Sequence, residues 1–118
     1  MTRLETFAEK KIFHVEKGEM TLNCEQDAVD MAALCGENDT NLILVGEGVA
    51  GEEFFDLKTG VAGAVLQKFS NYRIKAAFVI DREKARGRFA EMASESNRHG
   101  ANGFFFEEND ARKWLVSR

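Results

Sequence analysis

The chain has 118 residues and a net charge of −4, and 44% of its residues are hydrophobic. This size and composition predict one soluble domain over residues 1–118, and the mild acidity argues against a nucleic-acid-binding protein. The charged N-terminus lacks the apolar run of a signal peptide, and no stretch reaches the roughly 20 apolar residues that cross a bilayer, so we expect a cytoplasmic protein without membrane contact.

The chain begins with two predicted strands and then alternates between helices and strands. Weak apolar–polar alternation predicts strands near residues 3–8 and 11–16. Asn23 is expected to cap a helix over 25–36, and the apolar run at 41–45 suits a strand buried on both faces. The later elements are a helix capped by Thr59, a strand at 74–80, a helix capped by Asp81 and ended by Gly100, a strand at 103–106, and a short helix capped by Asn109 or Asp110.

This order, ββαβαβαβα, predicts an α/β fold. Strands separated by helices imply a mixed, mainly five-stranded sheet with parallel pairs, accompanied by four helices. A flavodoxin-like or receiver fold would begin with strand, helix and strand. The opening pair of strands therefore argues against those folds.

The segment GEGVAG at 46–51 has the G-x-G-x-x-G spacing of a dinucleotide-binding turn. Such a turn should open a long helix, but the apolar pattern that follows it is short. Three carboxylates, Glu47, Glu52 and Glu53, would also lie where a pyrophosphate binds. A flexible acidic loop is the favoured interpretation.

The segment DLKTGVAG at 56–63 looks like the start of a helix. Thr59 can cap it, with its hydroxyl accepting from the amide of Val61 or Ala62. Gly60 and Gly63 then fall in the first turn, where glycine is unfavourable. Either these glycines pack tightly against a strand, or they leave the helix start open to a phosphate or a partner.

The remaining polar residues give weaker signals. Cys24 and Cys35 favour two reduced thiols over a redox pair, and His14 favours a structural role. No catalytic set, metal-ligand spacing or cofactor motif can be assembled. A basic run favours a solvated helix face over a nucleic-acid surface, and it comprises Arg82, Lys84, Arg86 and Arg88, with Arg73 and Lys75 as possible extensions.

The motif FFDLKTGVAGAVLQKFSNYR, together with ESNR at 95–98, closely resembles an uncharacterised bacterial family, domain of unknown function 4180. The resemblance covers most of the chain and implies no established activity. More distantly, the element order and size are similar to the STAS domain of anti-sigma-factor antagonists. In that family a D-S-S-G-L-G loop precedes a helix, and a partner kinase phosphorylates its second serine.

The STAS resemblance places Asp56 at the acid of that loop and Thr59-Gly60 at its Ser-Gly. This chain has one extra residue before the hydroxyl, and Lys58 has no counterpart. The resemblance implies a STAS-like fold and phosphorylation at Thr59. An added phosphate would be stabilised by the helix amides and repelled by the nearby carboxylates, and such a balance suits a switch.

We therefore expect a non-catalytic regulatory or protein-interaction module, with catalysis left open. Its expected partner is another protein or a second copy of the chain. The alternatives are a small-ligand-binding protein or enzyme that takes a small anionic ligand at the same loop between Phe54 and Phe55, and a homodimeric scaffold built on exposed Phe or on Trp114. The expected binding residues are Glu47, Glu52, Asp56, Lys58, Thr59, Gly60 and Gly63.

Overall fold

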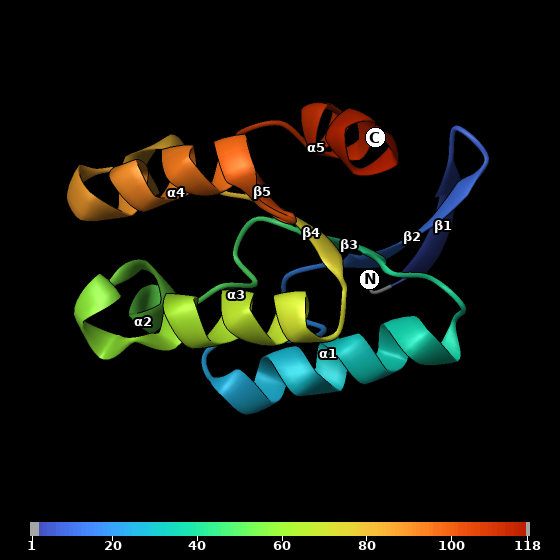
Figure 1. The fold of residues 1–118 in the computed structure, drawn as a ribbon, viewed down its shortest axis with the longest axis horizontal. Helices are drawn as coiled ribbons and strands as arrows, with labels where there is room; N and C mark the ends of the chain where they lie inside the picture. Colours follow the sequence, from blue (N-terminus) through green and yellow to red (C-terminus); the bar gives the residue numbers. More distant parts are fainter. Residues whose placement is uncertain (1–2, 118) are drawn as a thin grey trace.

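The computed structural model describes residues 3–117, apart from the side chain of His99. Its five strands form one sheet in the order β1-β2-β3-β4-β5 (Figure 1). The first pair is antiparallel and the others are parallel. The strands are β1 (Arg3–Phe7), β2 (Lys10–Val15), β3 (Leu42–Val45), β4 (Lys75–Val79) and β5 (Asn102–Phe105). The expected α/β class and mixed five-stranded sheet are confirmed.

The helices divide unequally between the two faces of the sheet. They are α1 (Glu25–Glu37), α2 (Glu52–Phe55), α3 (Val61–Asn71), α4 (Gly87–His99) and α5 (Glu108–Val116), with 3₁₀ turns η1 (Leu57–Thr59) and η2 (Arg82–Lys84). Four long helices were expected, and α2 adds a fifth, short one. Within residues 3–117 no helix has the length and apolar character needed to cross a membrane.

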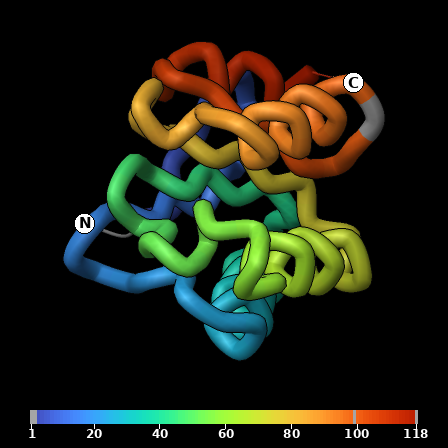
Figure 2. The backbone as a smooth tube through the Cα atoms, turned by 90° about the vertical axis from the view of Figure 1, so that its left-hand side faces the viewer, coloured from blue at the N-terminus to red at the C-terminus, as the bar shows by residue number. Residues whose placement is uncertain are grey.

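One face of the sheet carries the larger core. Strands that are parallel and adjacent in chain order need right-handed crossovers, which return on the same face. Side chains of α1, α3 and α4 accordingly pack in one apolar cluster with Phe13 and Val15 of β2. The alternate residue Ile12 faces the smaller cluster, where Ala111 and Leu115 of α5 pack against β3 and β4. Figure 2 shows α1 (cyan) and α3 (yellow-green) together at one side of the molecule and α5 (red) at the other.

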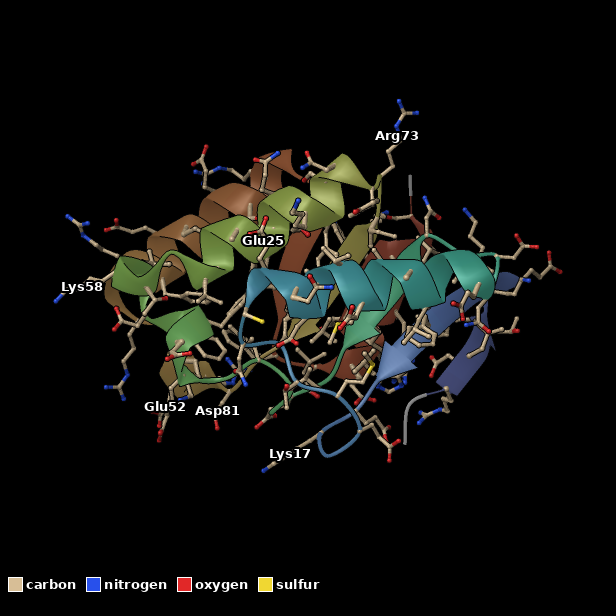
Figure 3. The ribbon with its side chains drawn as sticks, turned by 90° about the horizontal axis from the view of Figure 1, so that it is seen from below. Lys17, Glu25, Glu52, Lys58, Arg73 and Asp81 are labelled. Carbon is tan, nitrogen blue, oxygen red and sulfur yellow. The ribbon has the colours of Figure 1, made fainter. Side chains whose placement is uncertain are left out.

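Helices α1 and α3 lie side by side on the larger face. Glu25 at the start of α1 points toward α3, where its carboxylate lies 3.3 Å from the ammonium of Lys68 (Figure 3). Both side chains are substantially exposed, so this ion pair contributes little to stability. The close approach of the two helices rests on their buried residues, including Met31 and Val65.

The four expected helix N-caps are all wrong, including that of α3, where Gly60 stands in place of Thr59. Cys24, rather than Asn23, is the N-cap of α1. The Asp81 carboxylate accepts from the amide of Glu83 at 2.8 Å and so caps η2, whereas α4 begins six residues later, at Gly87. An aspartate bonded to the amide two residues onward stabilises a local turn, which ends before the longer helix starts. The N-cap of α5 is Glu107, rather than Asn109 or Asp110.

The outer edge of β5 is covered by side chains of α4. The Asn97 amide donates to the Phe104 carbonyl at 3.1 Å and accepts from the Phe104 N–H at 2.6 Å. The Ser96 hydroxyl donates to the Asn102 carbonyl at 2.7 Å. These bonds take the place of a neighbouring strand and satisfy edge groups that would otherwise be open. They account for two of the polar residues of α4, Ser96 and Asn97.

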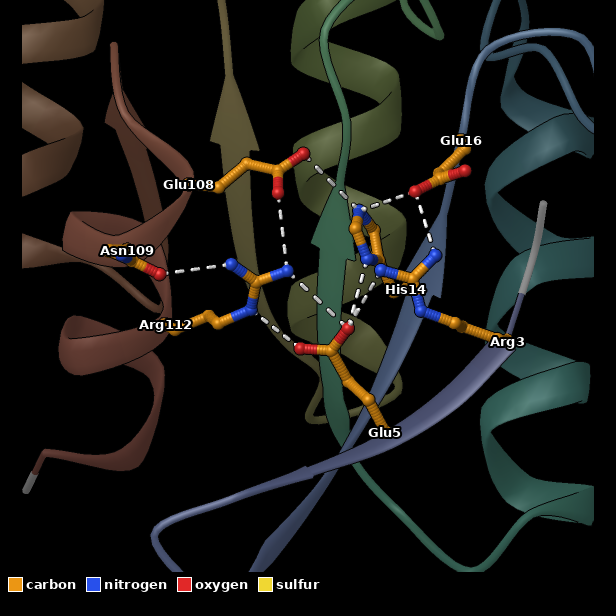
Figure 4. A network of polar contacts seen from close by, with 7 residues as sticks. All are labelled: Arg3, Glu5, His14, Glu16, Glu108, Asn109 and Arg112. Carbon is orange, nitrogen blue, oxygen red and sulfur yellow. Dashed lines mark hydrogen bonds and ion pairs between the residues drawn. The ribbon is translucent and has the colours of Figure 1, made fainter.

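Helix α5 is tied to the first strand by a network of charged side chains (Figure 4). The Arg112 Nε lies 2.6 Å from one oxygen of Glu5, and the other Glu5 oxygen lies 3.0 Å from Nδ1 of the fully buried His14. Burial alone would raise the pKa of Glu5, but the hydrogen bonds from Arg112 and His14 hold it below its ordinary value. Glu5 therefore stays ionised and fixes α5 over the sheet.

Replacing Asn97 by Ala should lower the free energy of unfolding by about 1–2 kcal/mol, because the edge groups of Phe104 lose both partners. Chemical denaturation measures this loss. Glu91→Ala, an exposed change on the same helix, serves as the control and should have little effect. Equal effects of the two changes would contradict the edge-covering role of Asn97.

The Glu5 network also predicts a pH dependence. Because the folded-state pKa of Glu5 is lowered from 4.5, its stabilisation is present above that pH and is lost as the pH falls through the lowered value. Glu5→Gln should therefore be less stable than the parent at neutral pH, and the difference should shrink below about pH 4.5. Denaturation curves across pH measure it, with the exposed Glu9→Gln as control. A difference that is constant with pH would disprove the assignment.

Candidate functional site

An open cleft lies at the carboxyl edge of the sheet, where the segments after β3 and β4 face each other. We call it the basic cleft, and its volume is about 630 Å³. In Figure 2, which views this edge, the amber segment after β4 lies above the green segment after β3. Ligands of α/β proteins commonly bind outside the carboxyl ends of strands. The lining residues are Phe55, Asp56, Leu57, Lys58, Glu83, Lys84, Arg86, Arg88 and Phe89.

A smaller apolar hollow adjoins the basic cleft. It measures about 130 Å³ and shares Phe55 and Lys84 with the cleft. Its floor is formed by the ends of β3 and β4, including Val45 and Phe78, and Glu47 lies at its rim. The two hollows together offer an apolar recess beside a charged one. This combination suits a ligand with two unlike ends.

The charge of the basic cleft comes from two separate segments. Lys58 belongs to η1, whereas Lys84, Arg86 and Arg88 come from the segment after β4. The Lys84 ammonium lies 5.4 Å from the centre of the Phe55 ring, within the range of a cation–π contact. Asp56 and Glu83 are the acidic side chains of the lining. Four cations against two acids give the cleft a net positive charge.

The wall formed by η1 is held by short polar contacts. Asp56 accepts from the Lys58 amide at 3.1 Å and so caps the turn. The Thr59 hydroxyl shares its hydrogen between the carbonyl oxygen of Glu53 at 2.6 Å and that of Asp56 at 2.8 Å. Its oxygen accepts a hydrogen bond from the Val61 amide at 3.2 Å. The expected contact with Val61 is thus present. Thr59 is nevertheless not the N-cap of α3, because Gly60 occupies that position with φ 78°.

The structure brings part of the expected residue set together. Asp56 and Lys58 line the basic cleft, and Glu47 lines the adjoining apolar hollow. Glu52, Thr59, Gly60 and Gly63 are exposed nearby without being among the lining residues. Of the two expected walls, Phe55 lines the cleft, but Phe54 is fully buried in the core.

The glycines at the start of α3 are not explained by tight packing. A Cβ added at Gly60 or Gly63 would meet no other atom within 4 Å. Gly60 is required by its positive φ, which side chains rarely adopt. Nothing in the packing accounts for Gly63. Both glycines are exposed, so tight packing against a strand is not the reason for them.

The glycines of GEGVAG allow the loop at 46–51 to pack against neighbouring segments of the chain. The loop lies against residues 22–23, where the Leu22 amide donates to the Val49 carbonyl at 2.9 Å. A Cβ at Gly51 would clash with the side-chain amide of Asn23, which would have to move aside. The helix that follows has only four residues. The loop is held against residues 22–23 and leads into no long helix, so it lacks the structure of a dinucleotide-binding turn.

The residues of the basic run do not form one face of a helix, although a helix face was expected. They lie in η2, in the following turn and in the first turn of α4, and three of them line the cleft. Arg73 does not extend the run, because it follows the end of α3 that lies away from Lys58 (Figure 3). Lys75 donates to the carbonyls of Trp114 and Ser117 at 2.8 Å and holds the end of α5. The sequence could have indicated the cleft through the position of its two segments, because each directly follows one of two neighbouring parallel strands.

A third hollow of about 260 Å³ lies on the other side of the Gly46–Gly48 loop. We call it the acidic hollow, and it is lined by Glu16, Lys17, Gly46, Glu47 and Glu108. The Nε2 atom of the buried His14 has no hydrogen-bond partner. It lies 3.7 Å from Oε2 of Glu108 and 3.8 Å from Oε2 of Glu16. Within residues 3–117 no set of three or more His, Cys, Asp or Glu side chains is arranged to hold a metal ion.

The two cysteines, Trp114 and the exposed Phe106 do not line any of these three hollows. Both cysteines are free; Cys24 is exposed, whereas burial raises the pKa of Cys35 to about 12. Trp114 is half-buried against Phe105. Phe106 is exposed, with the Arg82 guanidinium 4.3 Å from its ring centre. These aromatic residues belong to the α5 face and its margin.

Comparisons with known proteins identify a family without assigning it an activity. A family model described as Domain of unknown function (DUF4180) matches residues 7–115, from the end of β1 into α5. A search of curated proteins and a search of solved structures each found no match, so the STAS comparison rests on element order and size. The chain therefore belongs to the DUF4180 family.

Proposed function

We propose that this domain is a non-catalytic regulatory module that binds a small amphipathic anion in the basic cleft. The observation that carries the proposal is the convergence of four cationic side chains, from two segments, beside an apolar hollow. Phosphate and carboxylate groups are the natural partners of such cations. The apolar hollow would hold the uncharged end of the same molecule.

The position of Lys84 supports one ligand that spans both recesses. Lys84 borders the basic cleft and the apolar hollow, and so does Phe55. A ligand with an aromatic or short aliphatic group next to its charge would contact the Phe55 ring while pairing with Lys84. A purely inorganic anion would leave the apolar hollow unused. The proposed ligand class is therefore an aryl or alkyl phosphate or carboxylate.

Phenyl phosphate is a suitable probe for this prediction. It should raise the melting temperature more than inorganic phosphate or benzyl alcohol at the same concentration, because each of these offers only one of the two groups. Lys84→Ala combined with Arg86→Ala should weaken phenyl phosphate binding about tenfold by titration calorimetry. Arg73→Ala removes an exposed arginine that follows the end of α3 away from Lys58 and should leave binding unchanged.

Two results would contradict the proposal. Phenyl phosphate without effect on melting would exclude this ligand class from the cleft. Equal weakening by Arg73→Ala and by the Lys84 and Arg86 changes would mean that binding follows overall charge.

The η1 wall favours a second, related role, regulation by phosphorylation of Thr59. The single hydrogen of the hydroxyl is shared between carbonyl oxygens at 2.6 and 2.8 Å, and a phosphate ester there could no longer donate. Phosphorylation would therefore release η1, which carries Lys58 and Leu57 into the cleft wall. The added charge would also compete for the cleft cations.

The phosphorylation proposal predicts that Thr59→Glu weakens phenyl phosphate binding, whereas Thr59→Ser keeps the hydroxyl and leaves binding unchanged. Thr59→Val, which removes only the hydrogen bonds, should lower the free energy of unfolding by about 1 kcal/mol. Incubation with cell lysate and ATP, followed by intact-mass measurement, tests modification directly. A chain that gains no phosphate, together with a Thr59→Glu variant that binds normally, would disprove the switch.

A further inference from the structure

Two carboxylates border the apolar hollow beside the basic cleft. Glu47 belongs to the loop after β3, and Asp81 lies shortly after the end of β4. Neither residue lines the basic cleft, whereas Lys84 lines both the cleft and the apolar hollow. The apolar hollow therefore presents acceptors at a part of its wall that the cleft does not share. Binding of a simple aryl anion would give these acceptors no role.

The backbone holds Glu47 in place and leaves its carboxylate open. The Val49 amide donates to the Gly46 carbonyl at 3.2 Å and closes a turn in which Glu47 is the first corner residue. Gly48 is the second corner residue and has a positive φ of 91°. No residue from 3 to 117 forms a hydrogen bond or an ion pair with the Glu47 side chain. Both of its oxygens are therefore available as acceptors.

Asp81 is fixed more firmly and still has an acceptor to offer. Its Oδ1 accepts from the Glu83 amide at 2.8 Å, and its carbonyl oxygen accepts from the Lys84 amide at 2.9 Å. These two bonds set the position of Asp81 at the start of η2. Across residues 3–117 the other carboxylate oxygen, Oδ2, has no hydrogen-bond partner. The hollow thus has acceptors from two segments whose backbones are both held in turns.

An aromatic ring in the apolar hollow has to lie beside these acceptors. A plain phenyl ring displaces water from the carboxylates and provides no donor in return, which weakens binding. A ring N–H or an amino group provides donors. Hydrogen bonds to an ionised acceptor are stronger than those between neutral groups. The hollow therefore favours a ring that carries N–H donors away from its anionic group.

We propose that the ligand of the basic cleft is an aryl phosphate or carboxylate whose ring carries an amino group or a ring N–H opposite its anionic group. The anion pairs with Lys84 and Arg86, the ring occupies the apolar hollow, and the N–H groups donate to Glu47 and Asp81. This assignment rests on the proposed function, because the anion must first be held in the cleft. It adds the contact by which the site selects one amphipathic anion over another.

Titration calorimetry with three ligands of similar size tests the proposal. Para-aminophenyl phosphate should bind at least about fivefold more tightly than para-tolyl phosphate, whose methyl group has a similar volume and no N–H donor. The aryl amine is uncharged at neutral pH, so the two ligands carry the same charge. Phenyl phosphate, which has neither group, measures the binding that belongs to the proposed function alone.

Replacement of the acceptors should remove this preference. Glu47→Ala should lower the ratio of the two affinities at least about threefold, because it removes one acceptor completely. Asp81→Asn keeps the oxygen that caps η2, removes the charge, and should change the ratio in the same direction. Glu53→Gln alters an exposed carboxylate of α2 that lines none of the three hollows, so it should leave the ratio unchanged.

The outcomes separate this proposal from the function on which it rests. Equal affinities for para-aminophenyl and para-tolyl phosphate, both lowered by the Lys84 and Arg86 changes, would overturn the donor contact and leave the proposed function standing. A failure of all three ligands to bind would overturn both. A preference that survives Glu47→Ala and Asp81→Asn alike would also overturn the assignment, because other atoms would then accept the N–H groups.

Discussion

The strand order of the sheet constrains the rest of this fold. Strands β2 to β5 are parallel and neighbour one another in chain order, so right-handed crossovers bring α1, α3 and α4 to the same face. The opposite face depends on α5, a helix of nine residues. The pair between Arg112 and Glu5 fixes this helix to the far end of the sheet. Together with the apolar contacts of Ala111 and Leu115 and the hydrogen bonds from Lys75, this ion pair holds α5 on the second face.

The same strand order brings charged side chains together at the carboxyl edge of the sheet. Every segment that follows a parallel strand emerges there, which brings η1 opposite the segment after β4 and places the end of β2 beside the start of α5. The loop at Gly46–Gly48 separates the apolar hollow, which adjoins the basic cleft, from the acidic hollow. Two hollows of opposite charge therefore lie a few residues apart along one edge.

The strands and long helices were predictable because burial determines their sequence. The apolar runs at 41–45 and 74–80 are central strands covered on both faces. Helix caps were less predictable, because a side chain such as Asp81 can bond to the nearest free amide and form a short turn instead. The alternation of charges after Asp81 was interpreted as a helix face, although it belongs to a 3₁₀ turn and a helix start.

The candidate site was predictable only in part, because its halves are far apart in sequence. The glycines that follow Asp56 and Lys58 predict a binding role for these two residues, and the G-x-G-x-x-G spacing does so for Glu47. The partners of Lys58 across the cleft lie more than 25 positions later in the numbering, and only strand order brings them close. His14 gave no signal of its own, since its neighbours Glu5 and Glu108 come from the two ends of the chain.

The side chains of Ser96 and Asn97 have a consequence for assembly. They occupy the outward backbone groups of β5, so the sheet can be extended by strand addition only at β1. Growth of a continuous sheet through many copies requires two open edges on each copy. A molecule with one open edge can join a second copy across a two-fold axis, and that pairing leaves no edge for a third. The helix that follows the basic run thus limits strand-mediated association to a closed pair.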